Sequence, residues 1–341
     1  MAITQKDLAR QLGVAQVTVS RALRQDRGVN ESLRRRILNA AERHGYSLDS
    51  SNLEARRLRS RAGGIHVKTN VICAIVITDD DPAGFGGRIV KGMNDEGAAL
   101  GTEIVTCTRC RGKLPLIVAR QQVDGVIRLL GDVELTNAGD RPVMPWVSVL
   151  YEVPQVDLVT VDNFHGADQV GQHLCRLGHR RIGFIGPDTD LCRERLAGLR
   201  AAAAQAGATV PDECVRLRRY VASEEPTRQL LTEFLGDCAT LPFTALVAYN
   251  DYMADIALHY VRDHGRSVPG DLSLAGFDGV LPSRLREQAI ITTAAIPLEE
   301  LGRSAVRLLS WRLQSPEAPR RKVVLETAFV AGDTSGPPRG G

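Results

Sequence analysis

The sequence contains no long hydrophobic run. None of its apolar stretches reaches the ~20 residues that a transmembrane helix needs. Residues 1–23 are polar and amphipathic, whereas a secretory signal peptide has a continuous apolar centre. We therefore expect a cytoplasmic protein without a membrane partner.

Motifs of the common enzyme classes are also missing. The chain has no GxxxxGKS or GxxxxGKT phosphate loop, no GxSxG nucleophile elbow and no paired Ser/His/Asp signature. Residues 84–87, GFGG, lack the GxGxxG spacing of a dinucleotide site. His173 and His179 flank a predicted helix end and are not four residues apart on one face. We expect no enzymatic activity, no catalytic residue and no cofactor.

Cysteine is scarce and irregularly spaced. The seven cysteines are an odd number in apolar or helical contexts, which favours unpaired thiols in a reducing compartment. Cys107 and Cys110 have the CxxC spacing that can bind zinc or form a redox pair, but no second Cys/His pair follows at zinc-finger spacing. We therefore expect no metal site.

Positive charge is concentrated at one end of an otherwise ordinary composition. The chain has 341 residues, enough for two or three domains, with 43% hydrophobic and 24% charged residues. Its formal net charge is +3, yet residues 1–61 carry +7 and the remaining 280 residues carry −4. This distribution favours an N-terminal module that binds a polyanion.

Residues 1–46 have the pattern of three short helices. Thr4 can cap the first helix through a Thr-x-x-Asp box, and Gly13 allows a sharp turn after it. A second helix is predicted from about Ala15 to Arg24. The third, from Glu31 to His44, begins behind Asn30 as its N-cap.

The second helix has two chemically different faces. Val19, Ala22 and Leu23 form an apolar face that we expect to be buried. The opposite face combines an amide, a methyl surface, a hydroxyl and a guanidinium, which read base edges in a DNA major groove. These groups belong to Gln16, Val17, Ser20 and Arg21. The alternative, a merely solvated basic face, does not account for the concentration of charge.

Together these motifs resemble the lactose-repressor (LacI/GalR) family of transcription factors. The resemblance rests on GVAQVTVSRAL, RGVN, AAERHGY and ARRL in the head, and on VDNFHGA, RLAGLRAA, AYNDYMA and AGFDG downstream. It implies a sequence-specific transcriptional repressor that binds a pseudo-palindromic double-stranded DNA operator as a homodimer, or as a tetramer, under the control of a small-molecule effector. Ala15 departs from the family's usual Ser N-cap, and Arg24 stands where Asn is common.

The resemblance also assigns DNA-contacting residues. Gln16, Val17 and Arg21 are expected to read bases, and Thr4, Thr18, Ser20 and Arg24 to contact phosphates. Residues 47–68 would form a linker with a hinge helix, in which Arg56 meets phosphates and Leu58 enters the minor groove. This motif lies about three residues farther from Tyr46 than the family pattern, and the usual Pro-Asn is missing.

From residue 69 the pattern changes to alternating strands and helices. Such βαβ organisation predicts an α/β fold with parallel sheets covered on both faces. The resemblance implies a two-lobed, periplasmic-binding-protein-like core over residues 69–331. We expect the chain to be divided between the lobes about as follows: lobe one, residues 69–160 and 294–318; lobe two, residues 161–293 and 319–331. Residues 332–341, rich in Gly and Pro, are predicted to be disordered.

An effector is expected beyond the carboxyl ends of the strands, where α/β proteins bind ligands. By motif position, the resemblance makes Arg195, Asn250 and Asp278 effector-binding residues, with Tyr220 as an aromatic wall. Four strand-end residues in the first lobe complete the predicted site: Asp79, Phe85, Trp146 and Leu150. These groups suit a sugar or sugar-derived molecule.

Several alternatives accompany this site. Asp251 is expected to cap a helix and Asp162 to serve the crossing between lobes. Leu150 and Ile296 stand where polar residues are frequent in the family, so the cleft is expected to be less polar than a free-hexose site. An acidic effector could use four arginines that are more often surface charges: Arg109, Arg111, Arg128 and Arg193. The rival function is a solute-binding protein or α/β sugar-metabolising enzyme with an incidental helical head.

Overall fold

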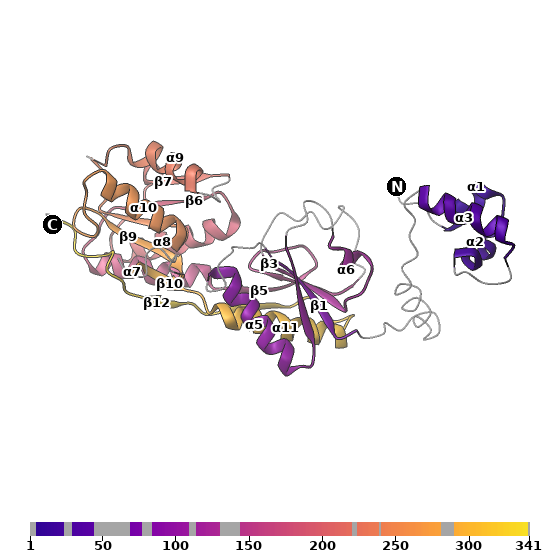
Figure 1. Ribbon diagram of the computed structural model, residues 1–341. Helices are drawn as coiled ribbons and strands as arrows, with labels where there is room; N and C mark the ends of the chain where they lie inside the picture. Colours follow the sequence, from indigo (N-terminus) through magenta and orange to yellow (C-terminus); the bar gives the residue numbers. More distant parts are fainter. Residues whose placement is uncertain are drawn as a thin grey trace. The chain divides into compact units, whose positions relative to one another are not determined.

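The chain folds into two compact units, Met1–Thr69 and Asn70–Gly341 (Figure 1). Within the described part, no helix is both long and apolar enough to cross a membrane. The computed structural model describes residues 5–23, 29–43, 69–76, 84–108, 114–129, 144–219, 224–238, 240–280 and 290–339.

The first unit contains the three predicted helices. They are α1 (Gln5–Leu12), α2 (Gln16–Leu23) and α3 (Glu31–Arg43). Their apolar faces meet in a small core, as the helical periodicity predicted. Its buried side chains include Leu8, Val19, Ala22, Leu23, Ile37 and Ala41.

The turn between α1 and α2 depends on Gly13. This residue has φ +67°, a left-handed conformation that glycine adopts without steric cost. The N–H groups of Gly13 and Val14 donate to the carbonyls of Arg10 and Ala9, at 3.4 and 3.0 Å. These two bonds satisfy the last carbonyls of α1 in a Schellman arrangement. The helix therefore ends at the predicted residue.

The second unit begins with an all-parallel sheet in the order β11-β5-β4-β3-β1-β2. The chain forms five of these strands before residue 162 and returns for the sixth near its end. The strands are β1 (Val71–Val76), β2 (Glu103–Thr108), β3 (Gly125–Leu129), β4 (Trp146–Val149), β5 (Asp157–Val161) and β11 (Lys322–Leu325). The helices of this lobe are α5 (Phe85–Ala99), α6 (Leu116–Ala119) and α11 (Leu298–Gln314).

The second sheet has the order β12-β10-β9-β8-β6-β7 and is parallel except for β12, which runs antiparallel to β10. The predicted α/β fold class is therefore confirmed. The strands are β6 (Ile182–Pro187), β7 (Val215–Arg218), β8 (Ala245–Ala248), β9 (Ser273–Asp278), β10 (Thr292–Ala295) and β12 (Ala328–Val330). The helices are α7 (Asn163–Arg176), α8 (Asp190–Gln205), the 3-10 turn η1 (Asp212–Cys214), α9 (Glu224–Leu235) and α10 (Asp251–Asp263).

Close helix packing is made possible by glycine. Helices α5 and α11 lie side by side (Figure 1). A Cβ atom at Gly302 of α11 would overlap the carbonyl oxygen of Ile89 in α5, and one at Gly92 would overlap that of Glu299. Only residues without a side chain allow the two backbones to approach this closely.

One predicted lobe boundary needs correction. β10 lies in the second sheet, so the chain crosses to lobe one after Ala295, close to the expected position near residue 294. β11 pairs with β5 in the first sheet, with Lys322 opposite Leu158, so the return crossing follows Leu325 and not residue 318. The sequence of a short strand shows which side chains alternate between its two faces, but it does not show which sheet the strand joins. The prediction was wrong here for this reason.

The predicted disordered tail is also corrected, because residues 332–339 pack on the second lobe. The Thr334 hydroxyl donates to the Leu274 carbonyl, and the Leu274 N–H donates to the Thr334 carbonyl, both at 2.7 Å. The Gly336 carbonyl accepts a hydrogen bond from the buried His179 ring at 3.0 Å. Composition suggested disorder because it does not reveal these long-range backbone partners.

Candidate functional sites

The outward face of α2 is accessible as predicted. Gln16, Val17 and Arg21 are exposed, and Val17 keeps 57% of its surface accessible despite being aliphatic. Thr18 and Ser20 are half-buried beside them. An amide, a methyl surface and a guanidinium therefore lie together on one face, where they can meet base edges. Four other predicted DNA contacts lie outside the described residues: Thr4, Arg24, Arg56 and Leu58.

The N-terminus of α2 has no side-chain cap at Ala15. The Ala15 carbonyl accepts from the N–H groups of Thr18 and Val19, at 2.9 and 3.2 Å. Asn30 caps α3 as predicted, because its side-chain oxygen accepts from the Ser32 N–H at 2.9 Å. The start of α2 consequently lacks the side-chain cap that α3 has.

In the second unit, Arg195 is the centre of a buried polar cluster. Its side chain comes from α8 and is only 4% exposed. Nε donates to the Asn163 side-chain oxygen at 2.9 Å, and Nη1 donates to the Tyr249 carbonyl at 2.6 Å. Nη2 lies 3.3 Å from Oδ1 of Asp278. All three nitrogen positions of the guanidinium therefore have partners.

Aromatic rings cover this guanidinium. Its central carbon lies 3.7 Å from the ring centroid of Phe277 and 4.6 Å from that of Tyr249. Such cation–π contacts favour a charged guanidinium in a desolvated position. Arg195 is thus held in one orientation by hydrogen bonds at its edge and rings on its faces.

Asp278 lies at the carboxyl end of β9. Its φ of +111° is rare for a residue with a side chain, and its carbonyl accepts from the Ile296 N–H at 3.0 Å. Desolvation raises the pKa of Asp278 to about 6, although Arg195 opposes this shift. The carboxylate therefore changes charge just below neutral pH.

The sequence analysis missed three members of this cluster: Asn163, Tyr249 and Phe277. Asn163 is fully buried at the start of α7, and its amide also donates to Glu194 at 3.2 Å. The preceding Asp162 is the N-cap of α7, accepting from the His165 N–H at 2.8 Å at the crossing between sheets. Asn163 and Phe277 stand in the VDN and GFDG motifs, so their positions could have identified them.

The expectation that Asp251 caps a helix is wrong, because Asn250 is the cap. The Asn250 side-chain oxygen, not Asp251, caps α10 by accepting from the Met253 N–H at 2.9 Å. Asp251 is buried, and burial raises the pKa of its carboxyl group well above the ordinary range. It accepts from the Val280 N–H at 2.9 Å, which holds the loop after β9. The Asn250 cap does not use its NH2 group, a donor suited to a ligand oxygen.

The first-lobe candidates do not all lie at the same edge. Leu150 follows the carboxyl end of β4 and is buried with φ +70°, and Phe85 begins α5, half-buried. Trp146, in contrast, begins β4, opposite Val126, and packs on the core around Val118. Strands rise about 3.3 Å per residue, so this ring lies at the opposite strand end and its assignment to the effector site is wrong. Asp79 and Tyr220 lie outside the described residues.

The arginines considered for an acidic effector are not gathered at this cluster. Arg193 is exposed and pairs with Asp188 at 2.5 Å. Arg128 is half-buried within β3. Arg109 and Arg111 lie outside the described residues.

One buried trio superficially resembles a hydrolytic triad. His179 lies between Thr244 and Ser273, with its ring nitrogens 2.7 and 3.0 Å from their hydroxyl oxygens. The ring nitrogen near Ser273 also lies 3.0 Å from the Gly336 carbonyl, so it must carry the proton and cannot take one from serine. Ser273 is fully buried as well. The trio is a structural network.

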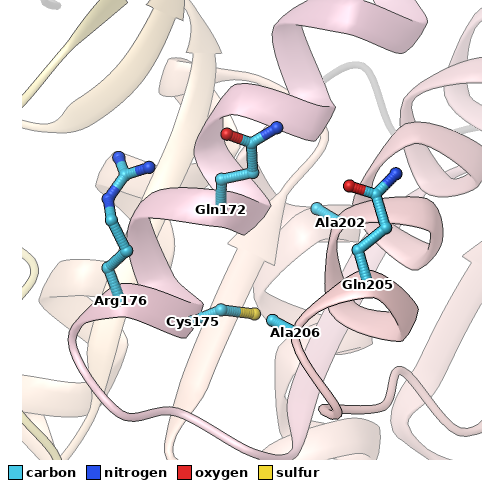
Figure 2. A pocket seen from close by; sticks show the side chains of 6 residues that line it. All are labelled: Gln172, Cys175, Arg176, Ala202, Gln205 and Ala206. Atoms are coloured by element: carbon cyan, nitrogen blue, oxygen red, sulfur yellow. The ribbon is translucent and has the colours of Figure 1, made fainter.

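A surface hollow of about 300 Å³ lies elsewhere, between the C-terminal ends of α7 and α8 (Figure 2). Cys175 lies in it, and burial raises the pKa of its thiol, so it is a poor nucleophile. Among the described residues, six cysteines form no disulfide and no cluster of metal ligands occurs. The lining residues are Gln172, Cys175, Arg176, Ala202, Gln205 and Ala206.

A helical DNA-binding head joined to a two-lobed ligand-binding core defines a class of transcriptional regulators. Residues 4–49 match the bacterial regulatory proteins of the lacI family, and residues 172–335 match the periplasmic binding protein-like domain. The chain is 30% identical to the HTH-type transcriptional repressor CytR of Escherichia coli over 329 residues, 92% of this chain and 90% of CytR. The protein belongs to the lacI family, which confirms the resemblance seen in the sequence.

Two other relatives span almost the full chain, and a third spans most of it. The HTH-type transcriptional regulator DegA of Bacillus subtilis is 25% identical over 351 residues, 99% of each protein. The transcriptional regulator CelR, solved as a cellobiose complex, matches 97% of this chain and 99% of CelR with a TM-score of 0.65 and 26% identity. A regulator from Enterococcus faecium with bound ribose shares the fold, with a TM-score of 0.66 over 78% of this chain and 99% of its own, at 24% identity. Members of the family are transcriptional regulators and not enzymes.

Proposed function

We propose that this regulator is a cytoplasmic repressor that binds a pseudo-palindromic operator as a homodimer. A sugar or sugar-derived effector would bind at the Arg195 cluster and change operator affinity. The coupling free energy between an effector site and a second binding site, here the one for DNA, is typically about 1 to 3 kcal/mol.

The buried Arg195 cluster is the observation that carries the proposal. A guanidinium, a carboxylate and a carboxamide converge there, and these groups bind vicinal hydroxyls. Phe277 and Tyr249 add aromatic surface for an apolar sugar face. Since Arg195 is almost fully enclosed, an effector must replace part of its present contacts. We assign the effector site to Asp79, Phe85, Leu150, Arg195, Tyr220, Asn250 and Asp278.

The exposed face of α2 supports the DNA-binding part of the proposal. A two-fold symmetric dimer would place two such helices in successive major grooves, which requires a symmetric operator. CytR is named a repressor, and CelR was solved with cellobiose, so repression and a sugar effector both have precedent among relatives. We assign base reading to Gln16, Val17 and Arg21, phosphate contacts to Thr4, Thr18, Ser20 and Arg24, and the hinge to Arg56 and Leu58.

Selection of bound duplexes from a random DNA pool tests both halves of the proposal. The full-length protein is used at moderate salt, alone and with a pool of monosaccharides, disaccharides and sugar phosphates. We expect a palindrome to be enriched and its recovery to change with one ligand pool. Arg195→Lys should abolish that change, whereas the neighbouring surface variant Arg193→Lys should retain it.

Each failure has a distinct meaning. If no sequence is enriched, specific DNA binding is contradicted and the solute-binding alternative gains support. If a palindrome is enriched but no pool alters its recovery, the sugar effector is contradicted. Enrichment of a non-symmetric site would contradict the symmetric dimer.

A further inference from the structure

Along the described residues of the second unit, the chain crosses between the two lobes three times, at residues 161–163, 295–298 and 325–328. The first and third crossings are hydrogen-bonded to each other, because the Asp162 N–H donates to the Leu325 carbonyl at 2.9 Å. A change in the angle between the lobes must bend the backbone at all three crossings. A residue that connects a bound ligand to the crossings can therefore influence that angle.

Asn163 makes three side-chain hydrogen bonds to described residues at the first crossing. Oδ1 accepts from Arg195 Nε at 2.9 Å, and Nδ2 donates to the Val161 carbonyl at 3.3 Å and to Glu194 Oε2 at 3.2 Å. Since an arginine side chain only donates, the amide oxygen must face Nε, and the NH2 group then faces a carbonyl and a carboxylate, which only accept. Asn163 is 1% exposed. Its orientation is therefore fixed, and it connects Arg195 to the end of β5.

Arg195 also contacts the second crossing, through Asp278. Nη2 lies 3.3 Å from Asp278 Oδ1, and the Asp278 carbonyl accepts from the Ile296 N–H at 3.0 Å. Ile296 directly follows β10, and α11 begins two residues later. The guanidinium is therefore connected to the backbone of two crossings, by Nε to the first and by Nη2 to the second.

The aromatic ring that covers Arg195 lies close to the third crossing. The Phe277 ring centroid is 3.7 Å from the guanidinium carbon. A Cβ atom at Gly166 of α7 would lie 2.8 Å from this ring and 2.6 Å from the Thr327 hydroxyl oxygen, so both side chains pack on the same bare stretch of α7 backbone. Thr327 is buried and lies between β11 and β12. The three crossings thus meet around the Arg195 side chain.

We propose that Asn163 is the positioning residue through which an effector bound to Arg195 acts on the lobe crossings. This inference rests on the proposed function, because it bears on regulation only if a ligand binds at Arg195. A ligand oxygen that accepts from the guanidinium competes with partners that its three nitrogens already have. A rotation of the guanidinium must then move Asn163 or break its hydrogen bond. Because Asn163 is bonded to Val161, either event changes the contacts of the first crossing.

Hydrogen exchange of the full-length, sugar-free protein tests this connection, with the Asp162 amide as the reporter. Arg195→Lys keeps the positive charge but places a methylene group where Nε donates, so it removes the bond to Asn163. Asn163→Leu removes the same bond from the other side at almost the same volume. We expect each variant to accelerate exchange of the Asp162 amide about ten-fold, the factor for one hydrogen bond to a charged group. The double variant should exchange no faster than either single variant, since all three lack the same bond.

Two controls accompany the exchange measurement. Arg193→Lys makes the same chemical change on the exposed side of α8, where Arg193 pairs with Asp188. Thr334→Val removes a buried hydroxyl that donates to the Leu274 carbonyl at 2.7 Å, within the second lobe. In both controls the Asp162 amide should exchange as in the unsubstituted protein.

Three exchange results would overturn the proposal. The first is equal exchange of the Asp162 amide in Arg195→Lys and Arg193→Lys. The second is an equal acceleration in Thr334→Val, which would reduce the effect to a general loss of stability. The third is multiplication of the two single effects in the double variant. If Asn163→Leu does not fold, the comparison of Arg195→Lys with Arg193→Lys still decides.

Duplex selection with the sugar pool separates this inference from the proposed function. Without sugar, Asn163→Leu should enrich the same operator as the unsubstituted protein, but it should need at least about ten-fold more of the active pool for the same change in recovery. Thr334→Val should keep the full response. An unchanged response of Asn163→Leu would overturn the proposal even where control by sugar stands. If the unsubstituted protein responds to no pool, the proposed function fails, while exchange of the Asp162 amide still decides whether Asn163 connects Arg195 to the crossing.

Discussion

Arg195 and Asp278 form a buried ion pair, with Nη2 and Oδ1 3.3 Å apart and side chains 4% and 13% exposed. Removing one member of such a pair leaves the other charge without compensation in a desolvated site. Arg195→Ala also removes the hydrogen bonds to Asn163 and Tyr249. We expect it to lower the free energy of unfolding by roughly 3 to 5 kcal/mol, measured by urea denaturation.

Arg193 provides the control for this prediction. It lies one helical half-turn away and pairs with Asp188 while remaining 61% exposed. Exposed ion pairs contribute about 0 to 1 kcal/mol, so Arg193→Ala should change stability little. Equal effects of the two substitutions would contradict the importance of burial at Arg195.

The pKa of Asp278 predicts a specific pH dependence. Burial raises it from 3.8 to about 6, so between these values the folded protein binds a proton that the unfolded chain has released. The stability contributed by this group is therefore present at low pH and lost as pH rises from about 4 to about 6. Asp278→Asn cannot titrate. Relative to this variant, the free energy of unfolding of the unsubstituted protein should fall by about 3 kcal/mol across this pH range.

Asp271 has a pKa shift of the opposite sign. Hydrogen bonds from Ser267 lower the pKa of Asp271, so its contribution is lost only below about pH 4. The difference in unfolding free energy between Asp271→Asn and the unsubstituted protein should therefore stay constant from above about pH 4 to about pH 6, the range in which Asp278 titrates. A flat difference between Asp278→Asn and the unsubstituted protein would show that the Asp278 pKa is unshifted.

The sequence predicted those parts of the molecule that depend on local patterns. The three head helices follow from 3.6-residue periodicity, and Gly13 and Asn30 mark their ends. Arg195, Asn250 and Asp278 were predicted because each stands in a short family motif, and the structure brings Arg195 and Asp278 together. Their positions along the chain required no knowledge of the packed structure.

Contacts between distant residues could not be predicted in this way. Asn163 and Tyr249 meet Arg195 across 32 and 54 residues, and no local pattern encodes those pairings. Trp146 was assigned to the wrong end of β4. The composition of a buried four-residue strand does not reveal where the strand begins and ends. The tail was predicted to be disordered because its Gly and Pro content conceals partners more than 40 residues away.

Removing the tail should therefore destabilise the second lobe. Truncation after Gly332 deprives His179, Ser273 and Thr292, all fully buried, of hydrogen-bond partners in residues 334–336. His179 and Ser273 keep their hydrogen bond to each other, but the N–H groups of Leu274 and Thr292 lose their acceptors in Thr334. Each buried polar group left without a partner costs about 1 to 3 kcal/mol, so the total loss should be at least about 2 kcal/mol. Thermal unfolding measures it, with removal of residues 340–341 alone as the control. Equal melting temperatures of the two truncated proteins would contradict a stabilising role of the tail.

Arg21 should determine preference at one base of the operator. Its side chain is exposed on α2 beside Val17, in the face that we propose enters a major groove. Arg21→Ala should weaken binding to the enriched duplex by about 1 to 3 kcal/mol and relax preference at a single position. Arg320→Ala removes the same charge from the surface of the second unit, where Arg320 pairs with Glu152. This control should leave the base preference intact. Parallel titrations of the selected duplex and of duplexes changed at one position distinguish the outcomes, because a loss uniform across all sequences would make Arg21 a phosphate contact.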